Sequence, residues 1–175
     1  SRVTVIEAAR ALGREDPEVA AVAIDHLRAE GVDIREGLAV ASVASSAGVV
    51  RVSLADGTPM QGSHLLVAAG RRPTLEGLDL DAAGVAFDRH GIRVGSGLRS
   101  LSNRRVYAIG DAAGGLQFTH VASYHAGLVL RSALFRLPVR AHTDHIPRVT
   151  FTDPELAHVG LTETEARERH GGAVE

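Results

Sequence analysis

The chain has 175 residues, a net charge of -2 and 45% hydrophobic residues, so it can bury a core over one domain or over parts of two. The charge gives no electrostatic case for nucleic-acid binding, and no apolar run is long enough to span a membrane. The sequence has no cysteine, which excludes internal disulfides and thiol catalysis within these residues. The N-terminus lacks the pattern of a signal peptide, so we expect a soluble, cytoplasmic protein.

The first 35 residues alternate between strand and helix signals. Residues 2–7 form a predicted strand that ends in an acid. A helix is predicted to begin at Asp16-Pro17, because Asp suits the N-cap and Pro suits the first turn. Gly31 suits the end of this helix, and residues 32–35 form a second short strand. The predicted apolar stripe of the helix consists of Val19, Val22, Ala23 and Leu27.

Turn residues then separate a group of predicted strands. Residues 38–45 and 49–55 form a predicted hairpin around Ala47-Gly48. Residues 64–69 are apolar and are predicted to form a buried strand, which Gly70 closes.

The middle of the chain begins with a loop-rich crossing that runs to about Arg104. It contains two short predicted strands, at 85–87 and 92–94. A buried strand is predicted at 106–109, and a helix from about His120 to Phe135.

The C-terminal part begins with a predicted linker at 138–147. Residues 148–151 read as a strand. Thr162 and Glu165 have the spacing of a capping box, which predicts a last helix that runs to His170-Gly171.

An acidic residue follows the predicted strand at 106–109. Gly110 permits a turn where a side chain would collide, and Asp111 then lies at the carboxyl end of the strand, where open α/β sheets bind ligands. Its carboxylate can accept hydrogen bonds from a sugar or ribitol hydroxyl. The helix that begins near His120 directs its positive end to the same place and favours negative charge.

The segment from Val106 to Asp111 reads Val-Tyr-Ala-Ile-Gly-Asp and resembles the second flavin motif of the pyridine nucleotide–disulfide oxidoreductases. The resemblance implies that Gly110 and Asp111 bind FAD, with the Asp111 carboxylate on the ribitol. Thr119 and His120 align with family residues that follow this loop, and the Thr119 backbone N–H would meet the flavin. The alternative for Thr119 is a helix N-cap without a ligand.

Glu7 ends the first predicted strand. An acid at the end of the second strand of a dinucleotide fold can accept hydrogen bonds from the adenosine ribose, and it repels a 2′-phosphate, which favours NAD over NADP. The context from Val3 to Glu7 resembles that strand of the family's NAD(P) domain. A surface acid is the alternative, and Arg10 and Arg14 keep NADP open because they could reach a phosphate.

Two further positions come from the resemblance. Val43 and Gly70 match family positions that approach the nicotinamide nucleotide. Residues 68–73 resemble the signature where the family's chain leaves the NAD domain and returns to the FAD domain. A surface turn is the alternative reading, and it is the better one for the side chains of Arg71 and Arg72.

Two other pairs of residues have side chains that could form sites. His142 and His145 could form a metal pair, but such spacings arise by chance and no third ligand is evident, so we predict no metal site. Tyr124 and His125 are more typical of packing residues than of catalysts. No residue of this chain is predicted to be catalytic.

Motifs in the family's order cover nearly the whole chain. Residues 150–162 resemble the opening of the family's interface domain, which makes a homodimer. The resemblance therefore implies an α/β, FAD/NAD(P)-binding Rossmann-like, three-layer fold with the start of an α+β interface domain. The expected domains are 1–72 for NAD(P), 73–144 for the returning part of the FAD domain, and 145–175 for the interface.

The resemblance implies that the chain is a truncated piece of a lipoamide dehydrogenase- or mercuric reductase-like flavoprotein. The expected Gly-x-Gly-x-x-Gly turn should precede Glu7 by about 20 residues, so the first strand and its glycine loop lie outside these residues. The resemblance implies hydride transfer from NAD(P)H to FAD and on to a disulfide, a metal ion or a quinone. The piece alone is expected to be inactive. The alternative is an inert, ordered module that serves only structure or association.

Overall fold

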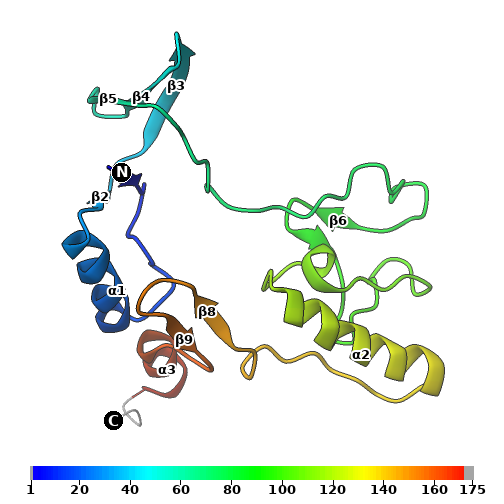
Figure 1. Ribbon diagram of the computed structural model, residues 1–175. Helices are drawn as coiled ribbons and strands as arrows, with labels where there is room; N and C mark the ends of the chain where they lie inside the picture. The colour runs from blue at the N-terminus through cyan, green and yellow to red at the C-terminus, as the bar shows by residue number, and fades with distance from the viewer. Residues whose placement is uncertain (1, 172–175) are drawn as a thin grey trace. The chain divides into compact units, whose positions relative to one another are not determined.

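The computed structural model describes residues 2–171 and divides the chain into two compact units (Figure 1). One unit combines Ser1–Ala68 with Pro147–Glu175, and the other is Ala69–Ile146. Among the described residues, no helix has the length and apolar character needed to cross a membrane.

The first unit begins with a parallel strand pair joined by a helix. β1 (Thr4–Ile6) pairs with β2 (Asp33–Arg35), and α1 (Pro17–Ala29) connects them. The helix ends in a Schellman motif, because the Gly31 N–H bonds to the Arg28 carbonyl and the Val32 N–H bonds to the Leu27 carbonyl. The predicted strand–helix–strand order and the predicted helix end at Gly31 are confirmed.

The buried face of α1 differs from the predicted stripe. Ala20, Ala23 and Ile24 are buried, whereas Val19 and Val22 are 43% and 56% exposed. The helix packs on β2 and on β9 (Leu156–His158), a strand from the far end of the chain. Of the predicted stripe, Ala23 is buried and Leu27 is half-buried, so the prediction is confirmed in part.

Three antiparallel strands follow in the same unit. β3 (Val40–Ser46), β4 (Val49–Leu54) and β5 (Pro59–Gly62) form one sheet with β4 in the centre. Ala47 and Gly48 have φ of 50° and 77°, as the predicted two-residue hairpin turn requires. The hairpin is confirmed, and β5 was not predicted.

The C-terminal segment completes this unit. β8 (Arg148–Thr150) pairs antiparallel with β9, and α3 (Glu163–His170) follows. Thr162 accepts from the Glu165 N–H, while the Glu165 carboxylate accepts from the Thr162 N–H at 2.8 Å, so the predicted capping box is confirmed.

The second unit is a small hairpin, a 3₁₀ turn and a long helix. β6 (Phe87–Asp88) and β7 (Gly91–Ile92) form the hairpin, η1 (Gly110–Ala113) is the 3₁₀ turn, and α2 spans Thr119–Phe135. The core is aliphatic, as expected, and consists of Leu80, Val85, Ile92 and Ala108. The predicted helix is confirmed, whereas the two strands overlap their predicted ranges only at Phe87 and Ile92.

Two predicted buried strands are absent from the described structure. Residues 64–69 form no strand there, and Leu66 and Val67 are 89% and 73% exposed. Residues 106–109 are extended but make only a bridge, in which Tyr107 lies opposite Arg99. A strand exists only where a neighbour completes its hydrogen bonds, and no described segment pairs with residues 64–69.

Candidate cofactor-binding site

Gly110 is the first residue of η1 and packs against α2. Its φ is +55°, and a Cβ atom built on it would lie 2.8 Å from the Cβ of Ala122 in α2. A side chain is therefore excluded both by the left-handed backbone and by the close approach of the helix. The predicted glycine turn is confirmed, and the close approach of Ala122 in α2 explains why the residue must be glycine.

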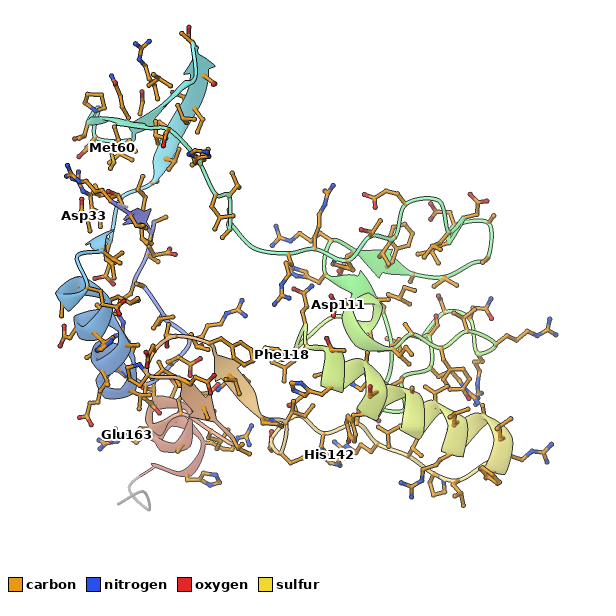
Figure 2. The ribbon with its side chains drawn as sticks, in the orientation of Figure 1. Asp33, Met60, Asp111, Phe118, His142 and Glu163 are labelled. Carbon is orange, nitrogen blue, oxygen red and sulfur yellow. The ribbon has the colours of Figure 1, made fainter. Side chains whose placement is uncertain are left out.

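Asp111 follows this turn on η1 and is exposed (Figure 2). Its backbone carbonyl accepts the Gly114 N–H at 3.0 Å. Within residues 2–171, however, its carboxylate makes no hydrogen bond or ion pair with the protein. The carboxylate thus does not cap its own loop and is available to a ligand.

The β6–β7 hairpin supports the loop after Asp111 from the other side. A Cβ built on Gly91 would lie 2.7 Å from the Gly114 N and 2.8 Å from the Ala112 O. Backbone therefore packs directly on backbone here, which only glycine permits at the φ of +148° found for Gly91. The sequence analysis missed this position, and the only signal was a glycine in a turn between two short strands.

The N-terminal end of α2 lies at the same site. Phe118 is the N-cap residue, and its side chain makes no cap hydrogen bond, so the N-cap alternative for Thr119 is wrong. Thr119 and His120 are the first two residues of the helix, both exposed, and the His120 ring stacks on Phe118 with 5.3 Å between ring centroids. Figure 2 places Phe118 and Asp111 at this end of the helix. A helix start without a side-chain cap presents backbone N–H donors and a partial positive charge.

His125 connects α2 to the Gly110 turn. The ring is 6% exposed, and Nδ1 accepts the Gly110 N–H at 3.1 Å. Burial lowers the pKa of His125 from its ordinary value of 6.5, which keeps the ring neutral. The packing reading is confirmed, but the sequence did not show that the partner is the turn before Asp111.

Two histidines of the linker, His142 and His145, contact Tyr124. The His142 N–H donates to the Tyr124 hydroxyl at 3.1 Å, and the His145 ring stands edge-on to Tyr124 with 5.0 Å between centroids. Over residues 2–171, no group of three or more His, Cys, Asp or Glu side chains is placed to hold a metal ion.

Glu7 lies directly after β1, at the carboxyl end of the parallel pair. Its backbone N–H donates to the Arg35 carbonyl at 2.9 Å, which extends the β1–β2 pairing by one residue. One carboxylate oxygen accepts the Ala9 N–H at 2.9 Å. The side chain is therefore oriented by its own loop, at the edge where a parallel sheet binds ligands.

Val43 and Gly70 are the remaining predicted positions. Val43 lies in the middle of β3 and is 50% exposed, in the same unit as Glu7 but in a different sheet. Gly70 belongs to the second unit, where it has a φ of +107° and open space around it. Arg72 makes an exposed pair with Glu76 at 3.8 Å, as expected for a surface turn. Within the second unit, η1 with Gly110 and Asp111 packs on α2, the helix that begins with Thr119 and His120.

Comparison with protein families agrees with this geometry. Residues 1–126 match the model described as pyridine nucleotide-disulphide oxidoreductase, and residues 146–175 match the dimerisation domain of the same family. The chain belongs to the pyridine nucleotide-disulphide oxidoreductases. The members of this family are flavoprotein oxidoreductases that use a pyridine nucleotide.

Individual relatives lie in the same family. The chain is 35% identical to dihydrolipoyl dehydrogenase of Bacillus subtilis and 34% identical to mercuric reductase of Bacillus cereus, over 98% and 97% of its own length. These matches cover 37% and 27% of the two relatives. The chain thus spans about a third of the length of the curated relatives that it matches.

Solved structures confirm the fold class. LpdA from Mycobacterium tuberculosis matches with a TM-score of 0.87 at 27% identity, over 96% of this chain and 37% of that one. The HOCl-induced flavoprotein disulfide reductase RclA from Escherichia coli matches with a TM-score of 0.84 at 33% identity, over 96% and 39%. The predicted α/β fold of FAD- and NAD(P)-dependent oxidoreductases is therefore confirmed.

Proposed function

We propose that this chain supplies part of the cofactor sites of an enzyme that passes hydride from NADH to FAD, and electrons on to a disulfide, a metal ion or a quinone. The observation that carries the proposal is the Asp111 carboxylate, which is exposed and unbonded within residues 2–171. Gly110 fixes the turn that presents this carboxylate. Family membership supports the reaction class.

The residues around Asp111 fit the polar part of a flavin cofactor. The Asp111 carboxylate would accept a hydrogen bond from a ribitol hydroxyl, and Thr119 at the start of α2 would offer its backbone N–H. Gly110 has a positive φ of +55° and packs on Ala122, which fixes the turn in front of Asp111. When bound, the flavin supplies the hydride and electron transfer itself.

Asp111→Ala in the full-length protein tests this proposal. A charge-assisted hydrogen bond contributes about 1.5–3 kcal/mol, so FAD affinity should fall roughly tenfold to a hundredfold. Asp111→Asn should cost less, because the amide oxygen still accepts. Unchanged FAD affinity in Asp111→Ala, or an equal loss of melting temperature with and without FAD, would contradict the role. A full-length protein that purifies without flavin would favour the inert-module alternative.

Glu7 supports the choice of NAD. The oxygen that accepts the Ala9 N–H orients the carboxylate, and the group would accept from ribose hydroxyls and repel a 2′-phosphate. Glu7→Ala should therefore narrow a preference for NADH over NADPH. Higher kcat/KM with NADPH in the unmodified enzyme would show that Arg10 and Arg14 decide the nucleotide instead.

The other assignments follow from family membership. Val43 and Gly70 would approach the nicotinamide nucleotide, with residues 1–72 as the NAD(P) part, 73–144 as the FAD part and 145–175 as the interface.

The dimerisation-domain match at 146–175 supports a homodimer. A cytoplasmic location stays a prediction. Turnover assays with lipoamide, mercuric ion and a quinone would identify the acceptor.

A further inference from the structure

A buried histidine holds the turn that carries the proposed flavin ligand. The Gly110 N–H donates to His125 Nδ1 at 3.1 Å, across 15 residues of chain, and the hydrogen bond is buried. Gly110 begins η1, and the preceding residue, Ile109, provides no side-chain cap. The His125 ring therefore satisfies a donor at the very start of the turn.

The same face of α2 contacts Gly110 a second time. Ala122 lies one helical turn before His125, and its Cβ is the atom that a side chain on residue 110 would meet at 2.8 Å. The turn is thus held by a hydrogen bond from one residue and by close packing on another. Both contacts come from the rigid body of α2, not from a loop.

The bond requires one protonation state of the ring. A ring nitrogen accepts a hydrogen bond only without a proton, so His125 must be neutral and carry its hydrogen on Nε2. Loss of the acceptor would leave a buried backbone N–H unsatisfied, which is costly, or would shift the turn until water satisfied it. The first outcome would destabilise the turn, and the second would change the position of the residue that follows, Asp111.

We infer that His125 is a positioning residue of the flavin site: through Nδ1 it holds the Gly110 N–H and thereby fixes the Asp111 carboxylate for its ligand. This inference rests on the proposed role of Asp111 as a flavin ligand.

Other titratable groups surround this contact. Asp111 lies on η1, Tyr124 is the neighbour of His125 on α2, and His142 and His145 reach Tyr124 from the linker. Tyr107 meets α2 further along, at Ser132. Only burial contributes to the lowered pKa of His125, so the contact should respond to pH through His125 itself.

Two amide variants in the full-length protein separate positioning from packing. His125→Asn places an acceptor oxygen near the position of Nδ1, whereas His125→Gln places it one bond further out, near Nε2. We expect His125→Asn to keep FAD affinity within about threefold of the unmodified protein, and His125→Gln to weaken it about five- to tenfold, as the loss of one hydrogen bond predicts. On acidification, FAD affinity should fall more steeply in the unmodified protein than in His125→Asn.

Amide hydrogen exchange of Gly110 without flavin gives an independent readout. Exchange should be faster in His125→Gln than in His125→Asn. Equal FAD affinity and equal exchange in the two variants would overturn the inference. If Asp111→Ala leaves FAD affinity unchanged, the proposed function fails. In that case, faster exchange of the Gly110 amide in His125→Gln still supports the hydrogen bond between Gly110 and His125. Equal exchange in the two variants overturns it. If His125→Gln does not fold, the ¹⁵N chemical shifts of the His125 ring in the unmodified protein provide the test. They report which ring nitrogen carries the proton, and a proton on Nδ1 would overturn the inference.

Discussion

The Asp16 carboxylate accepts a hydrogen bond of 2.9 Å from the Glu163 N–H, 147 residues further along the chain. Asp16 occupies the N-cap position of α1 but makes no side-chain bond to that helix. Glu163 is the first residue of α3, where backbone N–H groups lack partners within the helix. One carboxylate therefore satisfies the start of α3 and joins the two sequence segments that form the first unit.

Asp16→Ala should lower the free energy of unfolding of the first unit by about 1–2 kcal/mol, because it removes a charge-assisted bond to a helix N-terminus. Asp16→Asn should recover most of this loss, since the amide oxygen can accept. Asp25→Ala on the same helix is the control, because Asp25 makes only an exposed pair with Arg28 at 3.8 Å. Urea unfolding measures all three, and equal losses in Asp16→Ala and Asp25→Ala would contradict the role.

Gly91→Ala should disturb the loop after Asp111. The new Cβ would lie 2.7 Å from the Gly114 N at a φ of +148°, so the hairpin must move away from the loop. We expect a loss of about 2 kcal/mol or more in unfolding free energy, with weaker FAD binding. Gly127→Ala in α2 is the matched control, because nothing lies within 4 Å of its Cβ, and it should stabilise by about 0.5–1 kcal/mol. The prediction fails if both substitutions have the same sign.

The stability of the second unit should depend on pH through His125. Burial lowers the pKa of the folded-state ring below the 6.5 of an unfolded chain, so the unfolded state binds more protons between the two pKa values. The stabilisation is therefore fully present above about pH 6.5 and is lost as the pH falls toward the folded-state pKa. Melting temperature from pH 8 to pH 5 should show this loss, and His125→Asn should remove that part of the slope. An identical slope in the variant would show that other groups are responsible.

The 175-residue chain should self-associate through its exposed apolar segment. Leu66 and Val67 are 89% and 73% exposed, and their backbone lies in no described strand, so another chain can pair with it. Leu66→Glu should weaken association about tenfold, because burying one leucine contributes about 1.5–3 kcal/mol. Leu78→Glu, at 56% exposure in the other unit, is the control. Sedimentation velocity that shows a monodisperse monomer before any substitution would contradict the prediction.

Several features could be read from the sequence because their causes are local. The Schellman end at Gly31 and the capping box of Thr162 depend on hydrogen bonds within a few residues of each position. The hairpin turn at Ala47-Gly48 depends on backbone angles that few residues adopt. The glycine turn before Asp111 and the helix after it are local in the same sense, and they carried the family resemblance.

Features that depend on a partner distant in the sequence were decided by the tertiary structure alone. A strand needs a neighbour, so the apolar residues 64–69 and 106–109 could not be judged from their own composition. The buried side of α1 was set by β9, from the other end of the chain. The same reason applies to Asp16 with Glu163 and to His125 with Gly110, because hydrogen bonds across 147 and 15 residues leave no periodic or compositional signal in the sequence.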